Sequence, residues 1–480
     1  MARIFGILTL ALFLHVCLTG CTIRSGDKGV SHLENLVKAG NFTEAAFEAS
    51  QLRSTNKIPV TDHIRLDSLL ETMSRIRKDF TLTDSDVIQK MEKYNAGFDT
   101  KEMLRLEKEH KIDFLTIEGK KYYFKNCIGN IFRLDSLYRR LKVQKEGNEP
   151  DLISQFRVAD LAKIVQNTKQ SGQPVNSVRM KLSYTITVAP DAVPAGETIR
   201  CWMPFPRENH PRQQEVKLIL TEPAQSLISP VSDFQRSLYL EKTTSAHLPT
   251  VFHSEIQVTT FAQSFRLTPE MMKPYQTYDL LYQVYVAERP PQIIFNHKIK
   301  SLAKRILQDE TNPLLKVRKI YRWINDSVTW ASALEYSIMS DIPGFVIENH
   351  HGDCGMQTLL FMTLARYAGI PVKWQSGWML HPGAVNLHDW CEVWFEGYGW
   401  IPLDQSFGLQ DSPDPLIRDF YITSIDAYRL IVNDDISQPF TPVKKFFRSE
   451  PYDFQRGEVE WKGGNLYFDK WSWHMEVSYQ

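Results

Sequence analysis

The sequence predicts an α+β protein made of an N-terminal helical module, a β-sandwich and a mixed core of helices and antiparallel strands. Three observations predict this class. Apolar residues recur at helical spacing early in the chain, they alternate with polar residues from about residue 180, and helical and strand patterns both occur after residue 290. Helices and strands that occur in separate blocks are typical of α+β proteins.

The composition is that of an ordinary globular chain. Its 480 residues are 43% hydrophobic and 23% charged, which is enough for large cores in about three domains. The 56 Lys and Arg residues balance the 56 Asp and Glu residues. Nucleic-acid binders usually carry a basic excess, so this balance argues against a nucleic-acid partner.

The first 21 residues predict a bacterial lipoprotein signal. Arg3 precedes an apolar run over residues 4–16 that is too short to span a bilayer, and a Leu-Thr-Gly-Cys tetrapeptide follows at residues 18–21. This tetrapeptide resembles the lipobox of bacterial lipoproteins, in which the cysteine becomes lipidated. The alternative is an ordinary signal peptide with a chance cysteine. We expect lipidation at Cys21, and therefore a lipid-anchored location in the cell envelope of a bacterium, periplasmic or on the outer surface.

Residues 22–145 are predicted to form the helical module. It begins with a helical hairpin around the break at Gly40-Asn41, which resembles one tetratricopeptide-type unit with no second copy. A capping box at residues 83–86 and a small β-hairpin around Gly119 follow. Residues 146–179 are predicted to be a linker with a helix near its middle.

Residues 180–289 are predicted to form the β-sandwich. Short strands separated by Pro-rich turns are typical of this architecture, and the alternating patterns predict strands at residues 182–188, 199–203, 216–220, 254–260 and 278–286.

Residues 290–440 are predicted to form the mixed core. Helices are expected at residues 298–307, 313–326 and 354–368, the last ending at Gly369. Strands are expected at residues 372–379, 390–395 and 400–403. Residues 441–480 are predicted to be a C-terminal extension with a β-hairpin around Gly463-Gly464.

Three chemically active residues of the core each lie in a local signature. Cys354 directly precedes the apolar helix, His388 opens a strand, and Asp404 closes another. A thiol, an imidazole and a carboxylate are the parts of an activated cysteine nucleophile. Asp353 or the turn before it can cap the helix, so that its N-terminus stabilises a thiolate and holds an oxyanion. His388 is then the general base and acid, and Asp404 orients its ring.

The segment from about residue 316 to 405 resembles the transglutaminase-like core, a papain-type Cys-His-Asp fold. Three motifs carry the resemblance. Gly-x-Cys at residues 352–354 leads into a helix that ends in Arg-x-x-Gly-Ile-Pro, His-x-Trp-x-Glu-Val occupies 388–393, and Gly-x-Gly-Trp-x-Pro-x-Asp occupies 397–404. They cover under a quarter of the chain. The β-rich segment before them is similar to the sandwich that often precedes this core in secreted bacterial members.

The resemblance implies acyl transfer through a thioester on Cys354, with amide bonds of peptides or proteins as substrates and no cofactor. The acceptor is water or an amine, and we favour hydrolysis by a peptidase or amidase. An amidase that acts on a glycopeptide, as in the related peptide N-glycanases, is an alternative within the same chemistry. Three residues are candidates for the substrate groove: Trp330 and Gln375 could assist an oxyanion, and Trp390 shares the face of its strand with His388.

Two alternatives compete with this hypothesis. His351-x-x-Cys354 and His388-x-x-Cys391 form two pairs that could hold zinc, although this leaves Asp404 without a role. A transglutaminase-like fold could also serve as a non-catalytic peptide- or glycan-binding lipoprotein on the surface, for which an intact trio is unnecessary.

Overall fold

The computed structural model describes residues 25–54, 59–148 and 152–480. The predicted signal segment and Cys21 lie outside these residues. In the described part of the chain, no helix is long and apolar enough to cross a membrane. The described residues divide into two compact units, one containing 25–54, 59–78 and 115–122, and the other containing 79–114, 123–148 and 152–480.

The first unit contains three helices together with residues 115–122 of two strands. Val30 and Leu33 of one helix and Ala45 and Ala49 of the next are buried, and the chain turns between these helices at Gly40. Gly40 has a φ of +82°, and a Cβ there would lie 2.0 Å from the carbonyl oxygen of Thr116, so only glycine fits. The helices are α1 (Ser25–Lys38), α2 (Phe42–Ser54) and α3 (Val60–Asp79).

The second unit begins with short helices and strands. The predicted capping box is confirmed at Thr83 and Asp86. Residues 79–114 and 123–146 belong to the same compact unit as the core, whereas the sequence grouped all of 22–145 in one module. Its elements here are β1 (Phe80–Leu82), α4 (Asp84–Glu92), α5 (Thr100–Lys108), α6 (Cys127–Leu134) and α7 (Ser136–Glu146). The strands β2 (Phe114–Ile117) and β3 (Lys120–Phe124) lie largely within residues 115–122 of the first unit.

Two five-stranded sheets form the β-sandwich, one with the order β15-β9-β4-β19 plus β6 beside β9, the other with the order β18-β17-β5-β8-β7. Their inward-facing side chains share one hydrophobic cluster. The strands are β4 (Pro174–Val188), β5 (Thr198–Pro204), β6 (Gln213–Glu222), β7 (Ser226–Ile228), β8 (Ser237–Thr243), β9 (Thr250–Ser264), β15 (Ser424–Ile425), β17 (Glu458–Trp461), β18 (Gly464–Leu466) and β19 (Trp471–Tyr479).

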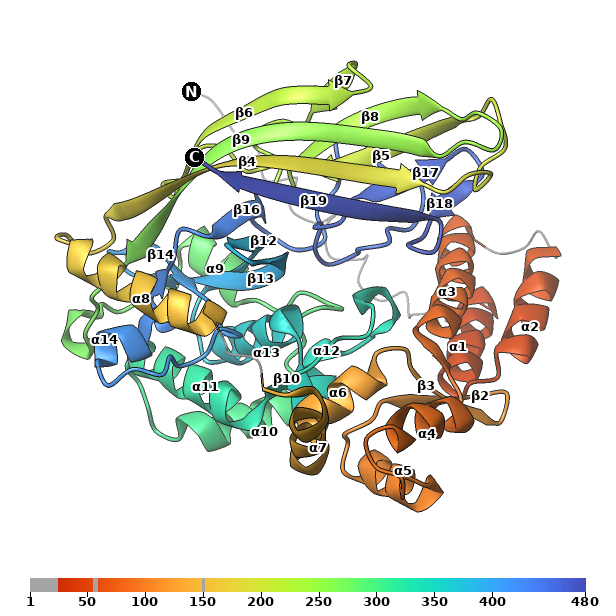
Figure 1. The fold of residues 1–480 in the computed structure, drawn as a ribbon, viewed down its shortest axis with the longest axis horizontal. Coiled ribbons are helices and arrows are strands. Elements are labelled where there is room, and N and C mark those ends of the chain that lie inside the picture. Colours follow the sequence, from red (N-terminus) through yellow and green to blue (C-terminus); the bar gives the residue numbers. More distant parts are fainter. Residues whose placement is uncertain (1–24, 55–58, 149–151) are drawn as a thin grey trace, which may run out of the picture. The chain divides into compact units, whose positions relative to one another are not determined.

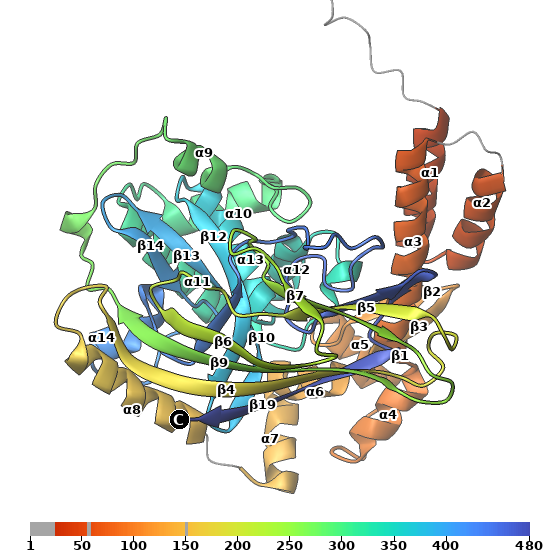
Figure 2. The same ribbon diagram turned by 90° about the horizontal axis from the view of Figure 1, so that it is seen from above.

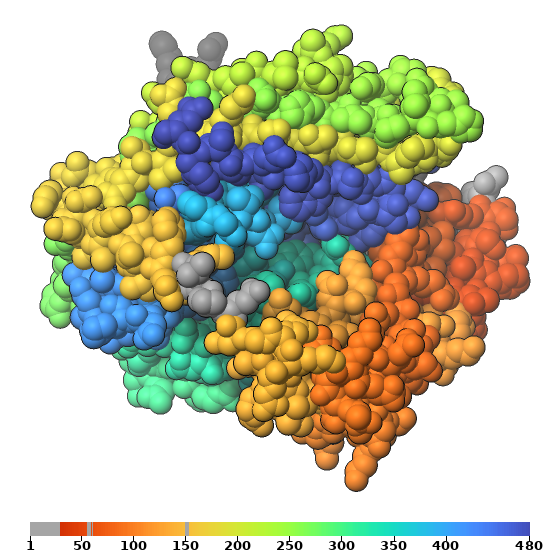
Figure 3. All heavy atoms as spheres, in the orientation of Figure 1, coloured from red at the N-terminus to blue at the C-terminus, as the bar shows by residue number. Residues whose placement is uncertain are grey.

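The C-terminal strands belong to this sandwich. The predicted hairpin of β17 and β18 is confirmed, but β17 pairs with β5 and β19 pairs with β4 along nine residues. Figure 2 shows β19 beside β4, and Figure 3 shows the same strand in dark blue against the yellow and green strands. The predicted boundary at residue 441 therefore separates strands that hydrogen bonds join.

The strand predicted at residues 278–286 is wrong, because this segment is the helix α9 (Leu280–Val286). Asp279 caps the helix by accepting a hydrogen bond from the Leu281 N–H. Tyr278 and Leu280 are 79% and 73% exposed. Strand propensity is strongly context-dependent, and this segment contacts the core sheet as a helix, with the Tyr285 ring 4.9 Å from that of Trp400 on β14 (Gly399–Leu403), rather than pairing with it as a strand.

The core places a buried helix against an antiparallel sheet, which confirms the α+β class (Figure 1). The sheet order is β14-β13-β12-β16. Its strands are β12 (Val372–His381), β13 (Ala384–Phe395), β14 (Gly399–Leu403) and β16 (Arg429–Asn433). A short parallel pair, β10 (Thr329–Trp330) and β11 (His351–Gly352), precedes the central helix. The helices are α8 (Leu152–Asn167), α10 (His297–Leu307), α11 (Pro313–Ser327), α12 (Ile342–Asn349), α13 (Cys354–Tyr367) and α14 (Pro415–Arg418).

Candidate active site

Cys354 is the first residue of α13. Asp353 is the N-cap, and its carboxylate accepts a hydrogen bond of 3.0 Å from the Met356 N–H, which confirms the predicted cap. Twelve consecutive residues from Gly355 onward are buried, so the packing of the helix holds its first residue in place. The Cys354 side chain remains partly exposed and reaches a cavity.

His388 and Asp404 meet as predicted. His388 lies on β13 and Asp404 follows β14, and their Nε2 and Oδ2 atoms are 2.8 Å apart. An ionised carboxylate only accepts hydrogen bonds, so we assign the ring hydrogen to Nε2 and leave Nδ1 as the basic nitrogen. Burial lowers the pKa of His388 despite the opposing charge of Asp404, so the imidazole is neutral at pH 7.

A third group holds this pair. Arg429 on β16 donates from Nε and Nη2 to the same Asp404 oxygen at 3.0 and 2.8 Å, and its Nη1 binds Asp426. Burial acts to raise the pKa of Asp404, but the charges of His388 and Arg429 outweigh it and keep the pKa below its ordinary value. Arg429 therefore positions the carboxylate that orients the imidazole.

Cys354 contacts Asp389 rather than His388. Its Sγ donates to Asp389 Oδ2 at 3.5 Å, and the structure records no hydrogen bond between Cys354 and the His388 ring among the described residues. Successive side chains of a strand point to opposite faces. Asp389 and Cys391 point toward α13, whereas His388 stacks on Trp390 with 5.9 Å between ring centroids.

The backbone at His388 lies beside an open edge of the sheet. β14 ends at Leu403, which pairs with Cys391, so no β14 residue pairs with β13 at His388. Gln455 occupies this region, and its side-chain amide donates to the His388 carbonyl and to Asp389 Oδ1, both at 2.8 Å.

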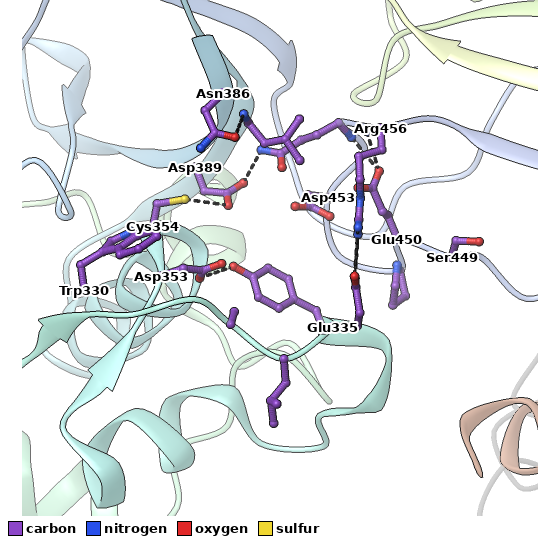
Figure 4. A pocket seen from close by; sticks show the side chains of 16 residues that line it. Trp330, Glu335, Asp353, Cys354, Asn386, Asp389, Ser449, Glu450, Asp453 and Arg456 are labelled. Atoms are coloured by element: carbon purple, nitrogen blue, oxygen red, sulfur yellow. Dashed lines mark hydrogen bonds and ion pairs between the residues drawn. The ribbon is translucent and has the colours of Figure 1, made fainter. Parts of the chain in front are cut away.

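The cavity beside Cys354 has a volume of about 210 Å³ and is shown in Figure 4. Trp330 lines it and is 40% exposed, in line with its predicted place in the groove. Gln375 and Trp390 do not line it. Both are fully buried, and Trp390 Nε1 donates to Gln375 Oε1 at 2.8 Å. These two predicted groove residues are therefore part of the buried structure of the sheet.

The electrostatics favour a neutral thiol. Burial, with the carboxylates of Asp389 and Asp353, raises the pKa of Cys354 well above its ordinary value. The sequence instead predicted a thiolate stabilised by the helix N-terminus. Burial also raises the pKa of Asp353 to about 6, and burial with the nearby Asp453 and Asp353 carboxylates raises the pKa of Asp389. The stabilisation of a thiolate by the helix N-terminus therefore does not outweigh the effect of burial and of the two neighbouring carboxylates on the pKa of Cys354.

The zinc alternative does not match the geometry. The described residues contain no group of three or more His, Cys, Asp or Glu side chains that could hold a metal ion. His351 lies 3.4 Å from Asp113, and Cys391 is buried in the hydrophobic cluster of α13. The four proposed ligands thus have separate surroundings, and all four cysteines that the structure describes, Cys127, Cys201, Cys354 and Cys391, are free.

Sequence reasoning missed several residues of the site. Strand alternation could have placed Asp389 on the face opposite His388, but it does not tell which of the two faces α13 covers. Arg429, Gln455 and Asp453 follow the three motifs by 25 residues or more along the chain, and no local pattern marks them. Only the tertiary structure brings them to the site.

Comparison with known proteins supports the assignment of the core. Residues 300–405 match the family model of the transglutaminase-like superfamily. A segment of 130 residues is 23% identical to the uncharacterised protein YebA of Bacillus subtilis, covering 23% of this chain and 18% of that protein. This chain therefore spans less than a fifth of that relative.

Two solved structures show a distant likeness. One is a candidate cysteine protease from Cytophaga hutchinsonii, at 19% identity and a TM-score of 0.41, covering 63% of this chain and 91% of that one. The other is the periplasmic domain of TgpA from Pseudomonas aeruginosa, at 13% identity and a TM-score of 0.26, covering 54% and 94%. The family match and the three motifs lead to one conclusion: residues 300–405 of this chain belong to the transglutaminase-like superfamily.

Proposed function

We propose that this chain is a cysteine enzyme that cleaves or transfers amide bonds of peptides or proteins. The observation that carries the proposal is the His388–Asp404 pair, held by Arg429, on the strand whose next residue, Asp389, contacts Cys354 at the helix N-terminus. The match of this segment to the transglutaminase-like superfamily supports a cysteine-dependent enzyme.

In the proposed reaction the Cys354 thiol attacks the amide carbonyl carbon and gives its proton to His388 Nδ1. The C–N bond then breaks, the amine leaves with that proton, and a thioester remains on Cys354. Water or a second amine attacks the thioester, with His388 again accepting a proton and returning it to the sulfur. The N–H groups at the start of α13 are suited to hold the carbonyl oxygen as it becomes negative.

The resting charges favour general-base catalysis over a preformed ion pair. Both the thiol and the imidazole are neutral at pH 7, since the pKa of Cys354 is raised and that of His388 is lowered. The proton must therefore move as the sulfur attacks. We infer that the Cys354 side chain turns from Asp389 toward His388 Nδ1 when substrate enters the cavity.

A trapping experiment tests this function. Purified protein is incubated with a neutral activated acyl donor, quenched, and analysed by mass spectrometry for a hydroxylamine-sensitive adduct on Cys354. We expect a rapid adduct in the wild type, none in Cys354→Ala, and a much slower one in His388→Ala. Equal acylation rates for the wild type and His388→Ala would contradict the proposed base.

A second candidate is a non-catalytic peptide- or glycan-binding module. The observation that favours it is the Cys354–Asp389 contact, which keeps the thiol away from the imidazole among the described residues. It predicts that peptides bind while no acyl-enzyme forms with any donor, and the same trapping experiment separates the two candidates.

We also propose that a lipid on Cys21 anchors the chain in a bacterial envelope. The support is the sequence of residues 1–21 alone. Mass spectrometry of the mature N-terminus tests it: a diacylated cysteine supports the anchor, and an unmodified or differently cleaved N-terminus contradicts it.

A further inference from the structure

The cavity beside Cys354 is strongly acidic. Five carboxyl groups line it, against a single guanidinium from Arg456; they belong to Glu335, Asp353, Asp389, Glu450 and Asp453. This excess is unusual, because the chain as a whole has equal numbers of acidic and basic residues. Buried carboxylates are costly unless they are paired or hydrogen-bonded.

Most of these groups have partners inside the protein. Arg456 donates to both Glu335 oxygens at 3.0 and 2.7 Å and also binds Glu450, so its charge is already shared. Asp353 accepts from Tyr336 and caps α13. Arg456 and three of the five acids thus already have hydrogen-bond or ion-pair partners inside the protein.

Asp389 has weaker partners. It accepts from the uncharged Gln455 amide at 2.8 Å and from the Cys354 thiol at 3.5 Å, and no cation pairs with it among the described residues. Its nearest like charges are those of Asp453 and Asp353.

The carboxylate of Asp453 has no partner in the described part of the chain, although the Asp453 backbone carbonyl accepts a hydrogen bond of 2.5 Å from Arg448. The residue is only 7% exposed, yet its carboxylate makes no hydrogen bond or ion pair there. Figure 4 shows it among the labelled acids with no dashed line reaching it. Burial and the Glu450 charge raise its pKa, while the charges of Arg456 and Arg448 oppose this shift. The carboxylate therefore faces the cavity with no donor from the protein, and a ligand that enters the cavity can supply one.

We propose that Asp453, together with Asp389, binds a primary ammonium group of the acyl-donor substrate, next to the amide that Cys354 attacks. The substrate class is thus peptides with a free amino group, on the N-terminus or on a lysine-type side chain, close to the scissile bond. This inference rests on the proposed function and specifies its substrate.

An ammonium group fits the site better than a metal ion. The side chains lack the geometry for a metal among the described residues. An ammonium is a compact charge with three N–H donors. It can donate to Asp453 and to Asp389 at once, which neutralises the two acids that lack a cation of their own.

Matched substrates test the proposal. Three peptides share one scissile amide: one has both a free N-terminus and a free lysine-type side chain, and each of the others has one of these amines acetylated. Hydrogen bonds to charged groups contribute about 1.5–3 kcal/mol, so we expect acetylation of the recognised amine to lower kcat/KM about 10-fold or more. The acetylated peptide that is cleaved more slowly shows whether the site recognises the α-amine or the side-chain amine.

Two variants sharpen the test. Asp453→Asn keeps the shape and removes the charge, so it should abolish the preference for the free amine over the acetylated peptide. A thermal unfolding midpoint close to that of the wild type shows that the variant is folded. Asp309→Asn makes the same chemical change at an exposed position after α10 and should leave the preference intact. Equal kcat/KM for free and acetylated peptides in the wild type, or an unchanged preference in Asp453→Asn, would overturn the inference.

A binding measurement separates this inference from the proposed function. Calorimetry with Cys354→Ala compares the free and acetylated peptides without turnover. Tighter binding of the free amine that disappears in Cys354→Ala/Asp453→Asn supports the ammonium site even if no acyl-enzyme ever forms. Equal affinities, with normal acylation of Cys354 by the neutral donor, would overturn the ammonium site and leave the enzyme assignment standing.

Discussion

The reactivity of Cys354 should rise when the neighbouring acid loses its charge. Asp389→Asn replaces the carboxylate 3.5 Å from Sγ with an amide of the same shape. A charge at about 4 Å changes the energy of a thiolate by roughly 1 kcal/mol in water-like surroundings and about 4 kcal/mol at a dielectric constant of 20. This corresponds to a fall of about one to three units in the pKa of Cys354.

The expected rate follows from this fall. Below the pKa, the thiolate fraction rises tenfold per unit, while the intrinsic nucleophilicity of the thiolate decreases with a Brønsted slope of about 0.45. The two effects together predict alkylation by iodoacetamide about 4- to 40-fold faster at pH 7.5 in Asp389→Asn than in the wild type.

The assay is a pH–rate profile of alkylation from pH 6 to 11, with the modified cysteine mapped by mass spectrometry. The wild type should react slowly at neutral pH and reach half its maximal rate above the ordinary cysteine pKa. Asp309→Asn should follow the wild type. Superimposable profiles for the wild type and Asp389→Asn would refute the electrostatic account, and so would fast wild-type alkylation at pH 6.

Three further outcomes are expected. Asp404→Asn should slow acylation about 10³- to 10⁴-fold, since it removes the charge that orients His388. It should also lower the free energy of unfolding in denaturant by about 1.5–3 kcal/mol, because it weakens the hydrogen bonds from Arg429. A decrease in the acylation rate of less than tenfold would contradict the role of Asp404 in orienting His388. Asp353→Asn keeps the helix cap but removes a carboxyl whose pKa is about 6 in the folded state, against an ordinary value of 3.8. Because the raised pKa makes the wild type less stable as the pH rises from 4 to 6, the unfolding free energy of the variant should increase relative to the wild type over this range, by up to about 3 kcal/mol. A difference in unfolding free energy that does not change with pH would contradict this. Asn130→Ala on α6 breaks two partly buried hydrogen bonds, of 2.9 and 2.8 Å, to the backbone of Ser332, which directly precedes the cavity-lining Ala333. Both thermal stability and kcat/KM should therefore fall, whereas an unchanged kcat/KM would show that α6 does not position this part of the cavity wall.

Much of the local structure was predictable from the sequence. The helix that begins at Cys354 was expected from a run of apolar residues between a capping aspartate and Gly369, and the structure ends it at Tyr367. The strand that carries His388 was expected to begin between His388 and Trp390 but begins at Ala384. The failure at residues 278–286 has a clear cause, since an apolar segment forms a strand only where another strand is available to pair with it.

The sequence by itself determined the α+β class, the helix that presents Cys354 and the chemical types of the trio, because caps, turn residues and hydrophobic periodicity act over a few residues. Only the tertiary structure decided which face of β13 packs on α13, because the alternation of side chains gives two faces without showing which one the helix covers. That choice determines whether the Cys354 thiol contacts Asp389 or His388. Tertiary structure also brought Arg429, Gln455 and Asp453 to the site, since contacts between residues distant in the chain arise from packing.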